Sequence, residues 1–537
     1  MRRWTRVGLG WLSACGAGLA VGCATERVAI PNGYLPPTSA VIDGQTATAL
    51  ASGPPRPTAP PPAPPADPTK KPPFELPPTL PGANATPVVP PKFDKDTPAE
   101  ERNRKVKEAY PDLTPVAATA PPGGQPVSLA DLTQLARANS PAIRKTLADA
   151  EASYGQVIQA GLHPNPTVGY QADQVQPSLR IPPGATFSGA GQQGGYVNQL
   201  IKTAGKLTLA QQVSGYDYIN ALVAVRKTEV DVTAAVRAAY FNALIAQQSV
   251  QVSRAVAELA DEVYRLQLKQ VAAGEAAGYE PLLLYAQAVQ ARTAVAQAEA
   301  LYKGAWRQLA AAVGQPDLPQ APLAGRADAV PPTFDQEAVK ARLVEEHTDV
   351  LTARNSIAQA QRNLVLQRKL PIPDLLTNTY QQYDNAAQTY QFGIQLGFQL
   401  PVSDRNQGNI RTAQAQIASA GHQLVSAQNA LSGRLGEAFA RYEANAAAVA
   451  NYRDKVIPSQ SQAYRAIIRR YQAEPEKVGF NDIVVAQQNL AQSLQAYMTA
   501  LGGQWQAVVD VANIGQLDDL YPAAPPGPIP PPTPPKK

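Results

Sequence analysis

The side chains that usually perform catalysis or bind metals are few and widely separated in this sequence. The three histidines are His163, His347 and His422, and no two of them have the short spacing that places two imidazoles on one metal ion. Both cysteines, Cys15 and Cys23, lie near the N-terminus. We find no nucleophile–base pair and no phosphate-binding loop with a recognisable spacing. The sequence therefore predicts neither an enzyme nor a metal site, and no cofactor.

One cysteine lies where a covalent modification is expected. Arg2 and Arg3 precede a short apolar run from Val7 to Val21, which is typical of a signal peptide, and the run ends in Leu19-Ala20-Val21-Gly22-Cys23. This ending resembles the bacterial lipobox, in which the cysteine is coupled to diacylglycerol and becomes the mature N-terminus. We expect residues 1–22 to be a lipoprotein signal peptide and Cys23 to carry the lipid. An ordinary signal peptide with an incidental cysteine is the alternative.

Charge and proline content separate a central body from two flanking segments. The formal charge of +5 is too diffuse over 537 residues for nucleic-acid binding. Of the 52 prolines, 26 lie in residues 1–126 and nine lie from residue 522 onward. Because proline lacks a backbone donor and favours extended conformations, we expect a Pro-rich disordered tether at 23–126 and a similar tail at 522–537. Recognition of these prolines by a partner is the alternative to a plain spacer.

The body contains landmarks that occur twice. Three landmarks of its first part recur in the same order: Pro164-Asn165-Pro166 as Pro371-Ile372-Pro373, Gln199-Leu200 as Gln399-Leu400, and Gly278-Tyr279 as Gly479-Phe480. The second and third landmarks are 79 residues apart in the first part and 80 in the second. We therefore divide the body into two equivalent halves, residues 127–330 and 331–521.

Long helices are expected in the interval between the second and third landmarks. Residues 204–273 lack proline and are rich in Ala, Gln, Leu and Val, so a rise of about 1.5 Å per residue predicts a helix on the order of 100 Å long. The counterpart, 406–473, contains Pro458, where we expect a kink. Residues 280–313 and 481–512 should return as antiparallel helices. The many alanines favour a wall of closely packed helices, and a conventional long coiled coil is the alternative.

Residues 390–400 alternate strictly between apolar residues and Gln or Gly. A period of two places these sets on opposite faces of a strand, and about 9 to 11 residues is the length of a tilted transmembrane strand. Weaker strands are predicted at 375–383, 167–175 and 196–201. A half-buried strand of a soluble sheet is the alternative. The residues expected to face lipid are Tyr390, Phe392, Ile394, Leu396, Phe398 and Leu400.

Four strands are too few to form a closed barrel within one chain. An open sheet in a bilayer would leave N–H and C=O groups unsatisfied at its edges, and the smallest single-chain barrels have roughly eight strands. We therefore expect several chains to close one barrel together.

With these landmarks in this order, residues 128–515 resemble the TolC-like outer-membrane efflux proteins, in particular their lipoprotein branch. The resemblance implies a mixed, mostly α fold, in which long antiparallel helices form a trimeric α-helical tunnel. A twelve-stranded transmembrane β-barrel, with four strands per chain, and an internal twofold repeat complete this fold. The implied function is a passive exit duct in the outer membrane of a Gram-negative-type envelope, extending into the periplasm. The implied partners are other copies of the same chain, in a homotrimer, together with a periplasmic adaptor protein, an inner-membrane pump and outer-membrane lipid.

The resemblance also assigns roles to residues around the two glycine turns. The periplasmic tip turns that adaptor hairpins grip correspond to Gly278, Tyr279, Gly479 and Phe480. The candidates for a pore constriction are Glu280, Asp482, Gln487 and Gln488. Acidic residues also suit helix N-termini, so a solvated helix start is the alternative for the two carboxylates.

A second hypothesis for the whole chain is a lipid-anchored periplasmic coiled-coil scaffold without a channel. It accounts for the long helices and for the Pro-rich segment. It leaves the alternation of residues 390–400 without a use.

Overall fold

The computed structural model describes residues 89, 91–93, 97–114, 123, 125–173, 191–385, 387–474 and 479–521. The chain divides into two units, residues 1–86 and 87–537, and all described residues belong to the second unit. The predictions for the signal peptide, for Cys23 and for the tail at 522–537 therefore lie outside the described residues. Most of the predicted tether also lies outside them.

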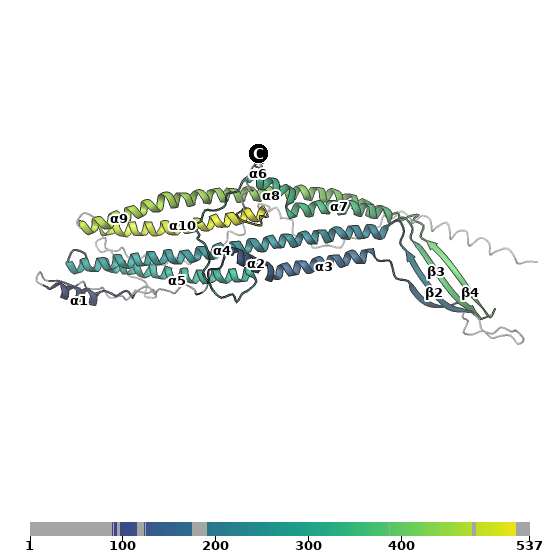
Figure 1. Ribbon diagram of the computed structural model, residues 1–537, viewed down its shortest axis with the longest axis horizontal. Coiled ribbons are helices and arrows are strands. Elements are labelled where there is room, and N and C mark those ends of the chain that lie inside the picture. The colour runs from purple at the N-terminus through teal and green to yellow at the C-terminus, as the bar shows by residue number, and fades with distance from the viewer. Residues whose placement is uncertain are drawn as a thin grey trace, which may run out of the picture. The chain divides into compact units, whose positions relative to one another are not determined.

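The structure is mostly helical with one small sheet, and a similar order of elements occurs twice (Figure 1). The first series is α2 (Leu129–Asn139), α3 (Pro141–Gly161), β1 (Thr167–Asp173), β2 (Gln192–Ile201), α4 (Lys206–Ala273) and α5 (Glu280–Val313). The second series is α6 (Gln336–Glu346), α7 (Thr348–Lys369), β3 (Leu375–Asp384), β4 (Thr389–Phe398), α8 (Gln407–Asn451), the π-helical turn η1 (Tyr452–Val456), α9 (Ile457–Ala473) and α10 (Phe480–Ile514). The predicted helices and strands are present with shifted ends, the largest shift being the earlier start of β2.

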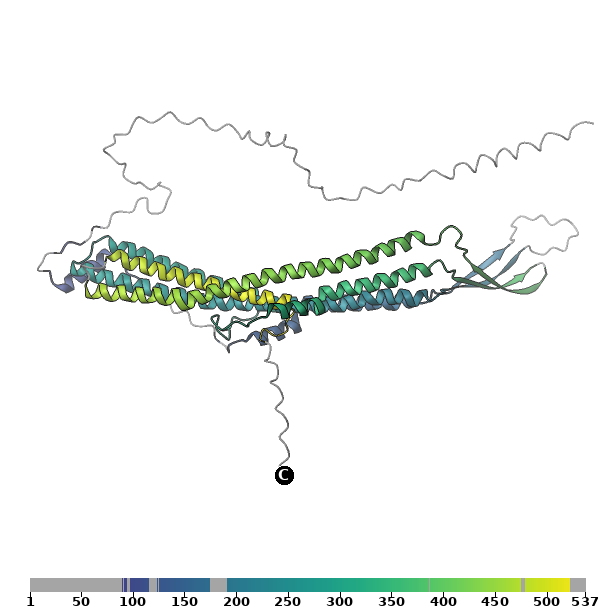
Figure 2. The ribbon, with the colours of Figure 1, turned by 90° about the horizontal axis from the view of Figure 1, so that it is seen from above.

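Helix α4 extends without a break over 68 residues. Its sequence contains no proline, so each backbone N–H within the helix can bond to the carbonyl four residues earlier. The helix ends at Gly274, which has a φ of +80° and donates its N–H to the carbonyl of Val271. Glycine adopts this left-handed conformation without a steric penalty. The chain then reverses, and α5 runs back beside α4 (Figure 2).

The corresponding long helix of the second series is interrupted near Pro458. The π-helical turn η1 precedes α9, and Pro458 lies in the first turn of α9. Proline has no N–H, and its ring would clash with the carbonyl of Asp454, four residues earlier. A widened turn relieves that clash. The irregularity predicted at Pro458 therefore takes the form of a π-turn.

The four strands form one antiparallel sheet in the order β1-β2-β3-β4. Tyr196 of β2 lies opposite Tyr380 of β3, and Ile394 of β4 lies opposite Thr379 of β3. Directly opposite residues share a face, so the register sorts the alternating residues of β4 onto the two faces of the whole sheet. The predicted hairpin between β3 and β4 is present.

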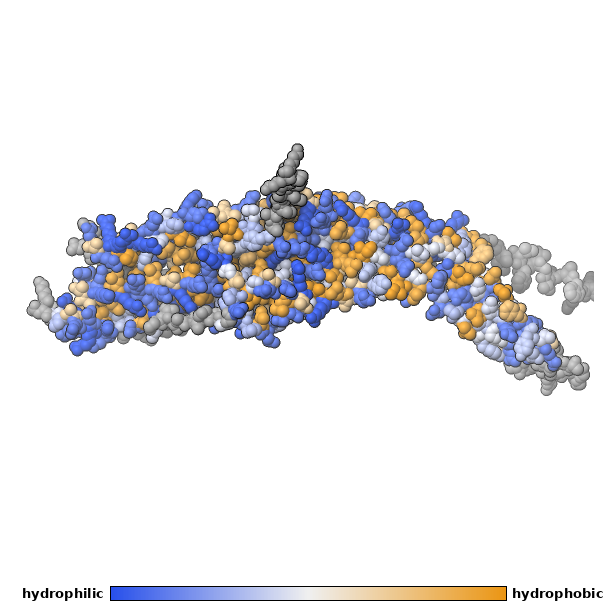
Figure 3. Space-filling model, in the orientation of Figure 1, coloured by the Kyte–Doolittle hydropathy of each residue, from blue (hydrophilic) through white to orange (hydrophobic). Residues whose placement is uncertain are grey.

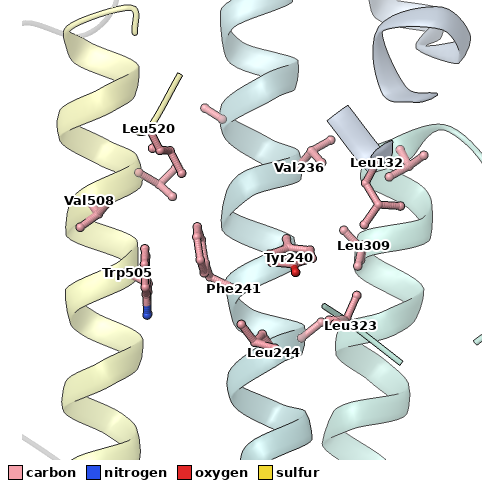
Figure 4. Packing of buried hydrophobic residues seen from close by; sticks show 14 of the residues in the cluster. Leu132, Val236, Tyr240, Phe241, Leu244, Leu309, Leu323, Trp505, Val508 and Leu520 are labelled. Atoms are coloured by element: carbon pink, nitrogen blue, oxygen red, sulfur yellow. The ribbon is translucent and has the colours of Figure 1, made fainter. Parts of the chain in front are cut away.

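The largest apolar cluster lies where α2, α4, α5 and α10 meet (Figure 4). Phe241 of α4 and Trp505 of α10 point toward each other in its centre, while Tyr240 points from α4 toward Leu309 of α5. The Trp505 indole N–H donates to the carbonyl of Ala327 at 2.7 Å, which satisfies a buried donor. This cluster joins the first series of elements to the second.

The expectation of a disordered tether over all of residues 23–126 is wrong for residues 97–114. They contain helix α1 (Ala99–Ala109), which buries Val106 against α4. Unlike the Pro-rich residues before it, this stretch contains a proline-free run with acidic residues in its first helical turn and Lys107 in its last. That charge order stabilises a helix, and the composition of the wider segment concealed it.

Among the described residues, no helix has the length and apolar character needed to span a membrane.

Candidate functional site

The first glycine turn connects α4 to α5. Tyr279 is 66% exposed, whereas the Gly278 carbonyl accepts a hydrogen bond of 2.6 Å from the Tyr110 hydroxyl. Pro281 lies in the first turn of α5, where its missing N–H would have no helical partner. The turn therefore presents Tyr279 to solvent while residues 97–114 hold its backbone.

The second glycine turn leads into α10. The Gly479 N–H donates to the Asp482 carboxylate at 3.1 Å, and this bond closes the start of the helix. Gly479 has a φ of −68°, which other residues also adopt. The side chain of Phe480 and residues 475–478 lie outside the described residues.

The two acidic candidates for a constriction both accept hydrogen bonds from other groups of the chain. Asp482 caps α10, as the helix-start alternative predicts. Glu280 accepts a hydrogen bond from the Gln267 amide nitrogen, and the Gln267 oxygen in turn accepts one of 3.1 Å from the Tyr471 hydroxyl. Burial raises the pKa of Tyr471, which keeps this hydroxyl protonated as a donor. Glu280 thus belongs to a network that joins α4, α5 and α9, and no sequence pattern indicated Gln267 or Tyr471.

The two glutamine candidates lie farther along α10. Gln487 is 5% exposed and Gln488 is exposed, and both line an open cavity of about 230 Å³ between α4, α5 and α10. The Gln487 side-chain oxygen has no hydrogen-bond partner among the described residues. Three further glutamines line the same cavity, Gln287, Gln290 and Gln495. This surface offers hydrogen bonds and carries no charge of its own.

The six residues predicted to face lipid are exposed in the single chain. Their exposed fractions lie between 63% and 74%, and five of them are in β4, with Leu400 two residues beyond its end. The other face of the sheet is polar. On it, Asp384 accepts hydrogen bonds of 3.1 Å from Gln192 and from Gln391, and Asp173 accepts one of 3.3 Å from Gln382. The sheet therefore has an apolar row along β4 on one face and a hydrogen-bonded amide and carboxylate layer on the other.

Two tyrosines of the inner strands lie over glycines of the outer strands on this polar face. Tyr196 covers Gly169 of β1, and Tyr380 covers Gly393 of β4, so that a Cβ atom at either glycine would overlap the ring. The alternation of Gln and Gly in β4 thus has a packing reason at Gly393. Glycine exposes strand backbone, and an aromatic neighbour shields it.

An ion-pair cluster that sequence reasoning missed joins the strands to the helices. The Asp374 carboxylate accepts hydrogen bonds from Lys206 at 2.7 Å, from Lys202 at 2.9 Å and from the Thr203 N–H at 3.0 Å. Burial alone would raise the pKa of Asp374, but these hydrogen bonds outweigh burial and hold that pKa well below its usual range. Asp374 directly follows the Pro-x-Pro landmark at Pro373. The lysines follow the Gln-Leu landmark, so the position of these groups beside the recurring landmarks was the signal in the sequence for this cluster.

The histidines do not form a site. His347 is buried, and its Nδ1 accepts the Asp349 N–H at 3.1 Å, which caps α7. Burial lowers the pKa of His347, which preserves the neutral acceptor form. His163, which follows α3, and His422 of α8 are both exposed. In the part of the chain that the structure describes, no group of three His, Cys, Asp or Glu side chains could hold a metal ion.

Comparisons with known proteins agree with this geometry. The family profile described as "Outer membrane efflux protein" matches residues 132–315. The cobalt-zinc-cadmium resistance protein CzcC of Cupriavidus metallidurans is 24% identical over 389 residues, which is 72% of this chain and 90% of CzcC.

Solved structures show the same fold. The outer membrane protein VceC of Vibrio cholerae matches with a TM-score of 0.60 and 16% identity, over 72% of this chain and 96% of VceC. The CmeC outer membrane channel of Campylobacter jejuni matches with a TM-score of 0.58 and 16% identity, over 73% of this chain and 87% of CmeC. Residues 132–315 therefore match the outer membrane efflux protein profile, and the chain as a whole is similar to CzcC and has the fold of these outer membrane channels.

Proposed function

We propose that this protein is the outer-membrane channel component of a tripartite efflux system and acts as a passive exit duct. The observation that carries this proposal is the sheet, whose strand β4 exposes an unbroken apolar row on one face while the other face is hydrogen-bonded and polar. A strand that separates lipid from water needs this division. The long helices then form the extension into the periplasm.

The sheet supports a trimer. It has two open edges, β1 and β4, whose backbone groups would remain unsatisfied in lipid. Three copies joined edge to edge would give a closed barrel of twelve strands, with the internal repeat placing similar hairpins around the ring.

Exposed apolar side chains on the helices support the same assembly. Figure 3 shows apolar patches on the helical surface between the polar areas. Such patches on a single chain commonly mark contacts with other chains. On α3 and α4 the exposed apolar residues include Leu147, Ile158, Ile219 and Leu222, and Leu162 directly follows α3.

The duct performs no chemistry of its own. In this arrangement an inner-membrane pump supplies the energy and a periplasmic adaptor connects it to the tip turns. The polar sheet face and the neutral glutamines near the tips would form a wet passage, in which selectivity depends on opening and on lining charge. Acylation of Cys23 would attach each subunit to the outer membrane through a covalent lipid, in addition to the strands of the barrel.

The relative named for cobalt, zinc and cadmium resistance suggests divalent metal ions as exported substrates. Growth of cells on these three ions, with and without the chain, tests this substrate class. Equal growth would remove these ions as substrates and leave the duct itself to be tested separately.

Conductance in planar bilayers is the decisive test of the duct. Purified protein should run as a heat-modifiable oligomer and conduct ions. A monomer whose residues 390–400 react with water-soluble reagents on both faces of the strand would contradict the proposal and favour the scaffold alternative.

A further inference from the structure

Residues 97–114 lie against the first tip hairpin, which consists of α4, its glycine turn and α5. Val106 and Tyr110 are 3% and 4% exposed and pack with Val271 and Ala272 of α4. This contact buries side chains as completely as the main core does. Three partly buried residues of the same hairpin also pack against this cluster, namely Leu268, Ala276 and Leu282.

Hydrogen bonds fix the segment beyond this apolar contact. The Tyr110 hydroxyl donates to the carbonyl of Gly278, and the Tyr264 hydroxyl of α4 donates to the carbonyl of Pro111, both at 2.6 Å. Leu113 is 7% exposed and joins the apolar cluster that contains Tyr264. The Tyr110 bond runs from the segment to the hairpin, and the Tyr264 bond runs from the hairpin to the segment. Together the two bonds fix the position of residues 97–114 on the hairpin.

The second tip hairpin, which consists of α9, its glycine turn and α10, has a different surface at the corresponding positions. Helices α4 and α9 end at Ala273 and Ala473, and six residues separate each end from the start of the next helix. Ala272, which packs under α1, lies one residue before the end of α4. The equivalent residue of α9 is Gln472, which is exposed, as is Arg469 one turn earlier. A polar surface is stable in water, whereas a group of apolar side chains is stabilised by a cover. The two hairpins therefore differ on the face that α1 covers.

The covered face points away from the second hairpin. In Figure 1, α4 and α5 lie between α1 on one side and α9 and α10 on the other. Helix α10 packs against α4, and α1 packs against α4 as well. Helix α1 therefore occupies a face of α4 that α5 and α10 leave open in the described part of the chain.

We propose that residues 97–114 are a built-in third helix of the first tip hairpin and occupy the face of α4 that a helical partner would otherwise use. This inference rests on the proposed function, in which a periplasmic adaptor docks helical hairpins at the tips. The adaptor then finds the face around Arg469 open and the corresponding face around Leu268 filled. Because the covering segment belongs to the same chain, its effective concentration exceeds that of a separate partner.

Cysteine labelling of the full-length protein tests whether the face is filled. Leu268→Cys and Arg469→Cys are made separately, and each purified oligomer is treated with a water-soluble maleimide. Labelling at position 268 should be roughly tenfold slower or more than at position 469. The added substitutions Val106→Asp and Tyr110→Asp should raise the rate at 268 to that at 469 and leave the rate at 469 unchanged. Equal rates at the two positions without these substitutions would overturn the proposal.

A fluorescent peptide with the sequence of residues 97–114 provides a second probe. It should bind the protein that carries Val106→Asp and Tyr110→Asp, whose face is uncovered, and should not bind the unsubstituted protein. A control peptide with the same two substitutions should bind neither. Equal binding of the peptide to both proteins would show that residues 97–114 do not occupy the face.

Complexes reconstituted with the adaptor test whether residues 97–114 keep it off the covered face of α4. A photo-crosslinker at position 469 should react with the adaptor, and one at position 268 should do so only together with Val106→Asp and Tyr110→Asp. A crosslink to the adaptor from position 268 of the otherwise unsubstituted chain would contradict the proposal that residues 97–114 keep the adaptor off this face of α4.

Bilayer conductance separates a failure of this inference from a failure of the proposed function. Protein that conducts but is labelled equally at both positions contradicts the third helix alone. Protein that is protected at 268 and does not conduct supports the third helix and contradicts the duct.

Discussion

Phe241 of α4 and Trp505 of α10 stack face to face, with ring centroids 4.0 Å apart and ring planes 9° apart. The two residues belong to helices separated by more than 200 residues of sequence, so their contact joins the first series of elements to the second. Both rings are buried in the largest apolar cluster of the described residues. The stack therefore couples the stability of the two helix hairpins.

Replacing Trp505 with alanine should lower the free energy of unfolding by about 3–5 kcal/mol, because it leaves a cavity beside Phe241 and removes the bond to Ala327. Thermal or denaturant unfolding of the purified protein measures the change. Gln506→Ala, one residue further on the exposed side of α10, is the control and should change stability by less than about 1 kcal/mol. Similar losses for both variants would mean that the stack contributes little.

Replacing Asp374 with asparagine should destabilise the junction of strands and helices. At neutral pH the loss should be about 3 kcal/mol, since Lys206, whose side chain is 6% exposed, would keep a buried charge without its carboxylate partner. The control is Asp149→Asn, which removes an exposed pair with Lys145 and should cost less than about 1 kcal/mol. Denaturant unfolding measures both losses.

The effect of Asp374 should depend on pH with a defined sign. Its folded pKa is depressed, so its contribution is complete above the ordinary carboxyl pKa of about 4 and decreases as the pH falls from there toward the folded pKa. The stability difference between the native protein and Asp374→Asn should therefore be smaller at about pH 3 than at pH 7. A difference that does not change with pH would contradict the assigned ion pairs.

Two glycines in the first tip hairpin should respond oppositely to alanine. Gly274 ends α4 with a φ of +80°, so Gly274→Ala should destabilise the hairpin by about 1–2 kcal/mol. Gly304 lies inside α5, and a Cβ atom added there would point into open space, so Gly304→Ala should stabilise it by about 0.5–1 kcal/mol. Unfolding midpoints measure both changes, and the same sign for the two variants would contradict this explanation.

The two faces of β4 should tolerate charge differently. Ile394→Arg places a cation on the face proposed to meet lipid and should cost about 2–4 kcal/mol near the bilayer centre. Gln395→Arg places the same charge on the polar face and should be tolerated. The fraction of heat-modifiable oligomer in membranes measures both effects. An oligomer that forms equally well with either variant would show that the apolar row does not face lipid.

The long helices and the four strands could be predicted from the sequence because each depends on a local pattern. The proline-free run of α4 and the strict alternation of β4 are such patterns. The docking of α1 could not be predicted in this way, since Val106 and Tyr110 are two apolar residues within a charged stretch. Their partners on α4 are more than 150 residues away. Segment composition describes an average, and it concealed one short amphipathic helix.

Some features of the candidate site could likewise be predicted from the sequence, and others could not. The glycine turns and the apolar row of β4 were found from repeated landmarks and periodicity. The Glu280–Gln267–Tyr471 network and the Asp374 cluster were missed, because each depends on side chains that only the tertiary fold brings together. Of the constriction candidates, Asp482 has a local explanation as a helix cap. No local pattern distinguishes a carboxylate that caps its own helix from one that lines a pore.

The π-turn at Tyr452–Val456 has a consequence for the direction of every side chain that follows it. One additional residue in a helical turn rotates the later part of the helix by about 100° about its axis. Helix α9 therefore presents to α10 a stripe of residues that an unbroken α8 would have directed elsewhere. The two tip hairpins are built from stretches of nearly equal length, and the additional residue of this turn, set by a single proline, decides which residues of α9 face α10.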